Sequence, residues 1–166
     1  NDYQKLSLTL SKLEKEKKKT ILFGVSYALL DLAEQFPQKL NNTIIIETRG
    51  TKGKRKEYLK EELHKILKNS FNLSVIHSEF GMTELLSQSY SKGNGIFKSP
   101  PWKKIFIRDV NDPLSFVEKE KTGGINVIDL ANLYSCPFIA TQDLGKLYED
   151  GSFSVLGRFD NSDVRG

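Results

Sequence analysis

Apolar residues in the first ninety positions follow helical and strand spacing in turn. An opening helix is predicted because apolar side chains recur every three or four residues, at Tyr3, Leu6, Leu10 and Leu13. Further helices are predicted over residues 26–35, 59–67 and, as a short element, 82–89. Strands are predicted between the helices, at residues 20–23, 43–47 and 73–77.

Local signals set the expected limits of these elements. Gly24 is expected to end the first strand, and Ser26 to cap the helix that follows it. The run TIIIE at residues 43–47 is almost continuously apolar, which predicts a strand buried on both faces. The alternation of strand and helix predicts a parallel sheet with right-handed crossovers. Ligands of such sheets bind at the carboxyl ends of the strands, so the candidate binding loops are residues 24–26, 49–51 and 78–84.

The pattern changes after Ser91. Turn residues become frequent, and only short strand-like runs remain, at residues 104–108, 125–130, 137–140 and 153–156. Asp150-Gly151 predicts a hairpin turn. The expected fold class is therefore α/β, with a parallel βαβ lobe over residues 1–90 and a smaller, antiparallel, barrel-like β lobe over residues 91–166.

Composition narrows the class of protein. Of the residues, 38% are hydrophobic and 28% charged, which argues for a globular protein and against global disorder. No apolar run reaches the roughly 18 residues of a membrane span. The single cysteine, Cys136, excludes an internal disulfide and is expected to be a buried thiol. A reducing, cytoplasmic location follows as the default.

Charge and histidine content exclude two further kinds of site. The net charge of +4 comes largely from lysines within residues 12–19, and no aromatic residues are interleaved with them. This favours a solvated helix face over a nucleic-acid surface. Only two histidines are present, which argues against structural zinc, and His64 is expected on a helix surface.

The stretch SEFGMTE at residues 78–84 is the first candidate for chemistry. Phe80 offers a face to a purine, and Gly81 lets the backbone approach a ligand closely. Thr83 offers a hydroxyl and a helix N-terminus to a phosphate, and Glu84 offers a hard oxygen to Mg²⁺. On composition alone, the same residues also fit a capped helix start.

Two later motifs place polar residues beside strand ends. In TQDLG, residues 141–145, Asp143 can accept hydrogen bonds from a ribose diol. In LGRFD, residues 156–160, Arg158 can pair with ribose or phosphate oxygens. Taken alone, Asp143 also fits a strand-end turn, and Arg158 also fits an ordinary surface arginine.

In this order and at these distances, the three motifs resemble the adenylate-forming superfamily of acyl, aryl and luciferin ligases. The surrounding words, among them IIIETRGTKGKRKE, HSEFGMTELLSQSYSKGNGIF and VLGRFDNSDVRG, resemble the acyl-protein synthetases. These enzymes are the fatty-acid ligase components of bacterial fatty acid reductase complexes. The resemblance runs from about Thr20 to Gly166 and corresponds to the C-terminal half of such an enzyme. The superfamily's Ser/Thr/Gly-rich phosphate loop has no match here, so the chain alone is expected to be inactive.

The resemblance implies a reaction that uses ATP and Mg²⁺, in which a fatty acid becomes acyl-AMP and then passes to a cysteine thiol. It implies catalytic roles for Thr83, Glu84 and Arg158, with Glu84 as the metal ligand. The nucleotide-binding residues that it implies are Gly50, Thr51, Phe80, Gly81, Thr83, Asp143 and Arg158. The acceptor cysteine is expected just past Gly166, and Cys136 is given no role. Expected partners are the fatty acid and an acyl-accepting reductase or carrier protein.

Two other functions stay open. The acceptor is coenzyme A if the chain belongs with the related acyl- and aryl-CoA ligases. A non-catalytic module that binds a nucleotide, an acyl carrier or RNA is the second alternative. The joint presence of Thr83, Glu84, Asp143 and Arg158 argues against the non-catalytic module.

Overall fold

The computed structural model describes residues 2–48 and 60–159. The chain divides into two compact units, Asn1–Glu79 and Phe80–Gly166, which we call the N-terminal and the C-terminal unit. The division falls earlier than the boundary expected after residue 90. Phe80 and Leu85 explain this difference, because both side chains pack into the core of the C-terminal unit.

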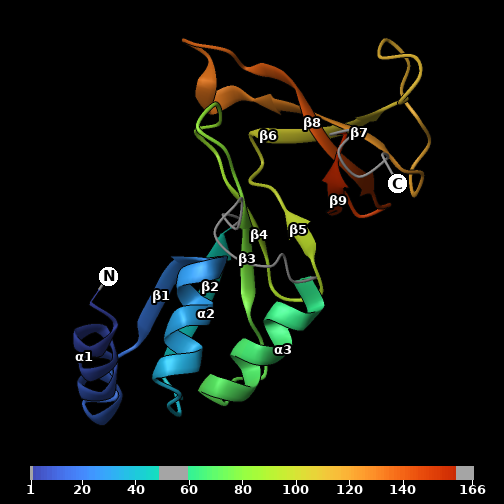
Figure 1. Ribbon diagram of the computed structural model, residues 1–166. Coiled ribbons are helices and arrows are strands. Elements are labelled where there is room, and N and C mark those ends of the chain that lie inside the picture. Colours follow the sequence, from blue (N-terminus) through green and yellow to red (C-terminus); the bar gives the residue numbers. More distant parts are fainter. Residues whose placement is uncertain (1, 49–59, 160–166) are drawn as a thin grey trace. The chain divides into compact units, whose positions relative to one another are not determined.

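The N-terminal unit alternates helix and strand, as its apolar spacing predicts. Its elements are α1 (Tyr3–Lys15), β1 (Thr20–Val25), α2 (Ser26–Gln35), β2 (Thr43–Thr48), α3 (Lys60–Phe71) and β3 (His77–Phe80). Strand β2 pairs in parallel with both β1 and β3, which confirms the predicted parallel sheet. Helices α2 and α3 lie against one face of this sheet (Figure 1). Leu22 and Ile45 of the sheet belong to the same buried cluster as Leu29 and Leu67 of these helices.

Four details of this unit differ from the expectation. The third strand was predicted at residues 73–77 but lies at His77–Phe80. Strand β1 continues through Gly24, where an added Cβ would lie 3.1 Å from the Leu29 side chain, so glycine serves close helix packing here. Helix α2 begins without a side-chain cap, because the Ser26 hydroxyl donates to Glu47 instead. Strand β2 is not buried on both faces: Ile45 is fully buried, whereas Ile44 is 48% exposed.

The C-terminal unit is antiparallel throughout its paired strands. Its elements are β4 (Ser89–Ser91), β5 (Ile96–Lys98), β6 (Lys103–Arg108), β7 (Gly123–Asp129), a 3₁₀ turn (Leu130–Asn132), β8 (Phe138–Leu147) and β9 (Phe153–Arg158). Among the described residues, these strands run in the order β4-β5-β9-β8-β7-β6. The antiparallel lobe is therefore confirmed, as part of an open sheet with β6 as an edge strand. It has more residues than the N-terminal unit rather than fewer.

The C-terminal unit differs from the expectation in two short strands and agrees with it in its hairpin. Strands β4 and β5 are short and were not predicted, and β4 begins at Ser89, where the helix over residues 82–89 was expected to end. The hairpin at Asp150-Gly151 is confirmed, with Gly151 at a φ of +79°, a conformation that glycine adopts without strain. The core combines aliphatic residues of β6 and β7 with three aromatic rings, those of Phe80, Phe97 and Phe153.

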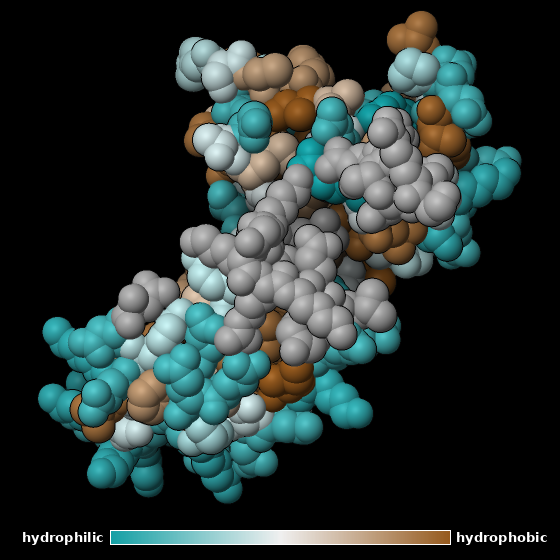
Figure 2. Space-filling view, viewed as in Figure 1, coloured by the Kyte–Doolittle hydropathy of each residue, from teal (hydrophilic) through white to brown (hydrophobic). Residues whose placement is uncertain are grey.

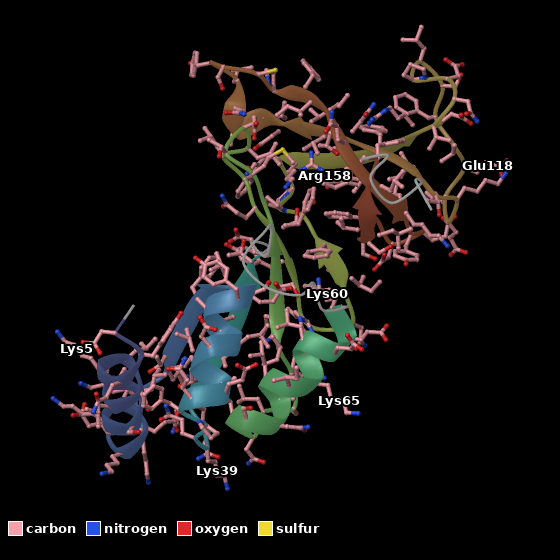
Figure 3. The ribbon with its side chains drawn as sticks, in the orientation of Figure 1. Lys5, Lys39, Lys60, Lys65, Glu118 and Arg158 are labelled. Atoms are coloured by element: carbon pink, nitrogen blue, oxygen red, sulfur yellow. The ribbon has the colours of Figure 1, made fainter. Side chains whose placement is uncertain are left out.

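The surface over the helices of the N-terminal unit is mainly hydrophilic (Figure 2). Lys5, Lys39 and Lys65 are exposed and point away from these helices (Figure 3). Within the part of the chain that the structure describes, no helix is both long enough and apolar enough to cross a membrane.

The adjacent isoleucines of β2 provide a direct test of this packing. Ile45→Ala is expected to lower the free energy of unfolding by about 2–5 kcal/mol, because it leaves a cavity in the core. Ile44→Ala removes the same atoms from a half-exposed position, and its effect is expected to stay below about 1 kcal/mol. Urea unfolding followed by circular dichroism measures both. Equal effects at the two positions would contradict the one-sided burial of β2.

Candidate functional site

Phe80 lies in the core of the C-terminal unit rather than in an open loop. Strand β3 runs to Phe80, so the first part of the SEFGMTE stretch is strand. The Phe80 ring is 6% exposed and contacts Phe97 and Phe153 edge-on, at centroid distances of 6.1 and 5.4 Å. The ammonium group of Lys103 lies 5.1 Å from the ring centroid. Stacking of a purine on Phe80 stays a prediction, and it requires these neighbours to withdraw from one face of the ring.

The helix predicted over residues 82–89 is wrong. Residues 81–88 form turns and bends, and β4 follows at Ser89. Thr83 therefore does not stand at a helix N-terminus, and any contact that it makes to a phosphate comes from its hydroxyl or its own N–H. Thr83 and Glu84 are both exposed, as is Gly81.

Tertiary hydrogen bonds explain why this segment is not helical. The buried carboxylate of Asp129 accepts from the Ser87 amide at 2.8 Å and from the Ser87 hydroxyl at 2.6 Å. The Glu84 carbonyl accepts from the Asn132 side chain, and the Ser87 carbonyl accepts from the buried Lys103 ammonium at 3.0 Å. Backbone groups that a helix needs for its own ladder are thus bonded to other parts of the sheet.

Burial alone would raise the pKa of Asp129, but the hydrogen bonds from Ser87 outweigh this effect and lower it. The carboxylate therefore stays charged and able to accept both bonds at neutral pH. Lys103 contributes in the same direction through its positive charge. The Ser87 hydroxyl in turn accepts from the Trp102 indole N–H at 2.9 Å. This cluster fixes the shape of the segment that presents Thr83 and Glu84.

Asp143 and Arg158 are brought together by the β8–β9 pairing. The two residues are direct partners in the antiparallel register, so their side chains leave the sheet on the same face. The TQDLG residues lie inside β8, and not in a strand-end turn. A register shift follows immediately, between Leu144 and Gly145. Bulges of this kind re-aim neighbouring side chains and are frequent beside active sites.

The Arg158 side chain is exposed at the end of β9 (Figure 3). Its guanidinium donates to the Gln142 side-chain oxygen at 2.9 Å. Asp143 is half-buried, and its amide donates to the Thr141 hydroxyl at 3.1 Å. A carboxylate and a guanidinium on one face of adjacent strands form a pair that can accept from, and donate to, a vicinal diol.

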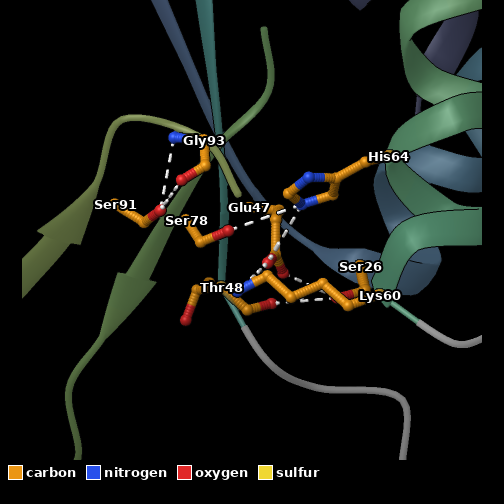
Figure 4. A network of polar contacts seen from close by, with 8 residues as sticks. All are labelled: Ser26, Glu47, Thr48, Lys60, His64, Ser78, Ser91 and Gly93. Carbon is orange, nitrogen blue, oxygen red and sulfur yellow. Dashed lines mark hydrogen bonds and ion pairs between the residues drawn. The ribbon is translucent and has the colours of Figure 1, made fainter. Parts of the chain in front are cut away.

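A buried polar cluster at the carboxyl end of β2 was missed by the sequence interpretation (Figure 4). The Glu47 carboxylate accepts from the Ser26 hydroxyl at 3.1 Å and lies 3.6 Å from the Lys60 ammonium. His64 lies 3.5 Å from the same carboxylate. His64 is only 8% exposed, so its expected place on a helix surface is wrong. The signal was available in the glutamate that ends the apolar run TIIIE.

This cluster does not have the geometry of a nucleophilic triad. The Ser78 hydroxyl lies 3.4 Å from Nε2 of His64, and the Glu47 carboxylate contacts the same nitrogen. A serine–histidine–carboxylate triad uses the two different ring nitrogens. Ser78 is also only 1% exposed, which closes it to a substrate. The cluster instead ties β2, β3, α2 and α3 together.

The pKa of Glu47 follows from these contacts. Burial raises it, but the hydrogen bond from His64, the charge of Lys60 and the hydrogen bond from Ser78 together lower it from 4.5 to about 2. Glu47 is therefore a carboxylate at any physiological pH.

The remaining predicted residues divide into two groups. Gly50 and Thr51 lie outside the described residues, and so do the basic residues 52–56. Cys136 is described, and the expectation of a buried thiol is wrong: it is exposed, with its Sγ 3.3 Å from the Phe138 carbonyl oxygen. It lies in the connection between β7 and β8.

The described residues fit one mode of Mg²⁺ binding. No group of three or more acidic, histidine or cysteine side chains that could form a metal cage occurs within residues 2–48 and 60–159. Mg²⁺ is, however, commonly held by one or two carboxylates together with substrate phosphates. The exposed carboxylate of Glu84 is suited to that arrangement.

Several solved structures share this fold. ATP-bound MatB from Rhodopseudomonas palustris superposes with a TM-score of 0.70 and 17% identity, over 95% of this chain and 33% of that chain. McyG A-PCP complexed with phenylalanyl-adenylate superposes with a TM-score of 0.63 and 17% identity, over 95% of this chain and 33% of that chain. The third structure is a double mutant of o-succinylbenzoate CoA synthetase (MenE) from Bacillus subtilis, bound with its product analogue OSB-NCoA. It superposes with a TM-score of 0.62 and 21% identity, over 92% of this chain and 33% of that chain.

This chain thus spans about a third of the length of these structures. The expected fold class, α/β with a parallel lobe followed by an antiparallel lobe, is confirmed, and at these identities the similarity concerns the fold alone. No family model and no curated protein sequence matches the chain.

The low pKa of Glu47 predicts how stability depends on pH. Because the folded-state pKa is about 2 and the ordinary value is 4.5, the carboxylate contributes stability on the order of 3 kcal/mol above pH 4.5. That contribution is lost as the pH falls toward 2. Glu47→Gln is therefore expected to be destabilised at pH 7, and the difference from wild type should shrink as the pH falls from 4.5.

Urea unfolding of both proteins at pH 7, 5, 4 and 3 measures this difference. Glu61→Gln, on the exposed surface of α3, is the matched control and should change stability by less than about 0.5 kcal/mol. A difference between Glu47→Gln and wild type that stays constant down to pH 3 would contradict the account of the Glu47 cluster.

Proposed function

We propose that this chain is part of an ATP-dependent ligase that activates a fatty acid as acyl-AMP and transfers the acyl group to a cysteine thiol. The observation that carries the proposal is the Asp143–Arg158 pair. It is set by strand register, in a fold shared with structures bound to ATP and to an acyl-adenylate. The sequence resemblance to acyl-protein synthetases supplies the fatty acid and the protein acceptor.

In the proposed first step, a carboxylate oxygen of the fatty acid attacks the α-phosphorus of ATP. The P–O bond to pyrophosphate breaks, and acyl-AMP forms. Asp143 accepts hydrogen bonds from the ribose hydroxyls, and Arg158 donates to ribose or phosphate oxygens, which fixes the nucleotide for attack. The Thr83 hydroxyl donates a hydrogen bond to an α-phosphate oxygen, where negative charge must be stabilised. Gly81 allows the close approach of the backbone.

Glu84 would hold Mg²⁺ together with the phosphates of the nucleotide, and the ion would supply charge neutralisation during phosphoryl chemistry. Glu84 and Thr83 come from one exposed segment, whose shape the Asp129–Ser87 hydrogen bonds fix. Both side chains are therefore presented to solvent from a segment with a defined shape. Gly50, Thr51 and Phe80 are proposed to border the adenine, by analogy with related ligases.

In the second step, a thiolate attacks the carbonyl carbon of acyl-AMP, AMP leaves, and a thioester forms. An acyl phosphate anhydride is needed because a free carboxylate does not accept a thiolate. Coenzyme A is a second candidate for this acceptor, favoured by the similarity to the CoA synthetase MenE. A protein thiol, in a reductase or carrier protein, is the acceptor that we propose.

The Asp143–Arg158 pair can be tested by calorimetry with a non-hydrolysable acyl sulfamoyl adenosine. Asp143→Asn is expected to weaken binding by about 10- to 100-fold, because it removes the charge from hydrogen bonds worth ~1.5–3 kcal/mol. Glu149→Gln, which makes the same charge change in the exposed turn between β8 and β9, should bind like the wild type. Equal affinities of Asp143→Asn and wild type would remove the proposed role of this carboxylate.

The acceptor can be identified with the parent protein, ATP, Mg²⁺ and a radiolabelled fatty acid. Our proposal predicts label on protein that is released by neutral hydroxylamine, as expected for a thioester. Label that moves to coenzyme A with comparable rate would favour the CoA ligase. If a broad panel of carboxylic acids yields no acyl-adenylate at all, the ligase proposal fails.

A further inference from the structure

Arg108, at the end of β6, bonds to the neighbouring strand β7 and, beyond it, to β8. Its Nη1 donates to the Asn126 side-chain oxygen at 2.7 Å and to the Ile125 carbonyl at 3.2 Å, both on β7. Its Nη2 donates to the Thr141 carbonyl at 2.7 Å, on β8. The planar guanidinium suits this task, because its N–H groups project as a rigid fork and its charge is permanent.

Gly124 makes room for this side chain. It is the direct register partner of Arg108, and a Cβ added there would lie 2.5 Å from Cζ and 2.8 Å from Nε of Arg108. The β7–β8 register shifts between Gly124 and Asn126. A bulge disrupts the ladder and leaves backbone groups that need other partners. The guanidinium N–H groups of Arg108 donate to two carbonyls at this point, those of Ile125 and Thr141.

One route from Arg108 leads to Asp143. The Thr141 residue whose carbonyl accepts from Arg108 also donates its hydroxyl to the Ile125 carbonyl, at 2.9 Å. The same hydroxyl oxygen accepts from the Asp143 amide at 3.1 Å. Arg108 and Thr141 thus share the Ile125 carbonyl, and the backbone of Asp143 is bonded directly to this group of residues.

A second route leads to Arg158. The guanidinium carbon of Arg108 lies 5.2 Å from the centroid of the Phe159 ring, within the range of a cation–π contact. Phe159 follows Arg158 in the chain, and its amide donates to the Gln142 carbonyl at 2.8 Å. The Gln142 side chain accepts from Arg158 itself. Arg108 therefore contacts a neighbour of each member of the Asp143–Arg158 pair.

We infer that Arg108 is a positioning residue for the nucleotide site: it clamps β8 and the end of β9 so that Asp143 and Arg158 face a ribose together. This inference rests on the proposed function, which assigns the ribose to that pair. Arg108 acts through Thr141 and Phe159, because its bonds go to oxygens of the sheet. Sequence spacing gave no sign of it.

Two variants disturb the clamp in different ways. Arg108→Lys keeps the charge but loses the fork that reaches Asn126 and Thr141 together. Gly124→Ala keeps the arginine but displaces it, since the added methyl group meets the flexible end of the side chain rather than backbone. Lys104→Met is the control: it removes a cation from the same strand and the same face, at an exposed position.

The clamp itself is measured by amide hydrogen exchange of the 166-residue chain, without ligand. Both variants are expected to accelerate exchange of the Asp143 and Phe159 amides at least tenfold. The Tyr148 amide, which donates to the Ser152 carbonyl at the other end of the hairpin, should exchange as in wild type. Unchanged rates at Asp143 and Phe159, or equal acceleration at all three amides, would overturn the inference.

The consequence for the site is measured as ribose discrimination. The ratio of dissociation constants for 2′,3′-dideoxy and ordinary acyl sulfamoyl adenosine should fall toward one in both variants and stay at the wild-type value in Lys104→Met. A merely structural role would lower the melting temperature but leave this ratio unchanged, and that result refutes positioning. A wild-type chain that shows no discrimination counts against the proposed function instead, and the exchange experiment still decides on the clamp.

Discussion

The pairing of β8 with β7 on one side and β9 on the other is the constraint on which the candidate site depends. β8 is the longest strand, and its register with β9 sets Asp143 opposite Arg158. Both neighbouring ladders contain a register shift close to these residues. Shifted ladders lose regular hydrogen bonds, so side chains must hold the strands in place here. Arg108, Thr141 and Gln142 do so, with bonds between 2.7 and 3.2 Å to β7, β8 and β9.

The two units use buried charge in the same way. In the N-terminal unit Glu47 joins two helices and two strands, and in the C-terminal unit Asp129, on β7, bonds to Ser87 in the turns of residues 81–88. For both carboxylates, hydrogen bonds outweigh burial and lower the pKa, so both remain charged acceptors at neutral pH. Breaking a buried pair of this kind destabilises strongly, because it leaves a desolvated group without its partner. The Glu47 cluster therefore holds helices and strands together, and the Asp129 cluster fixes a segment that has no regular secondary structure.

Much of the fold was predictable because the spacing of apolar residues along the chain depends directly on the local secondary structure. The helices of the N-terminal unit, the parallel order of its strands and the Asp150-Gly151 hairpin all follow from spacing and turn residues. The errors come from tertiary contacts. The 82–89 helix is replaced by turns because Asp129, Asn132 and Lys103 take up its backbone groups, and all three are distant in sequence. Ile44 looked like Ile45 in the sequence, yet only one of them faces the helices.

The residues of the candidate site likewise fall into those that the sequence identified and those that it did not. Asp143 and Arg158 were identifiable from motif residues, but their direct pairing depends on a bulged register that no local pattern specifies. Arg108 was not identifiable, because it is recognised only by its partners on other strands. Glu47 was visible only as the glutamate that ends the apolar run TIIIE, and its partners lie on α2 and α3. The burial of His64 and Cys136 was predicted wrongly for a related reason. His64 is buried because it contacts the Glu47 carboxylate, which is distant in sequence, and Cys136 is exposed although a thiol is usually buried.

The most direct test of the central claim is a crystal structure of this chain with a non-hydrolysable acyl sulfamoyl adenosine. Our account predicts that both ribose hydroxyls lie within hydrogen-bond distance of the Asp143 carboxylate, with Arg158 on the same ligand. A nucleotide bound elsewhere on the chain, with Asp143 and Arg158 away from the ribose, would contradict it.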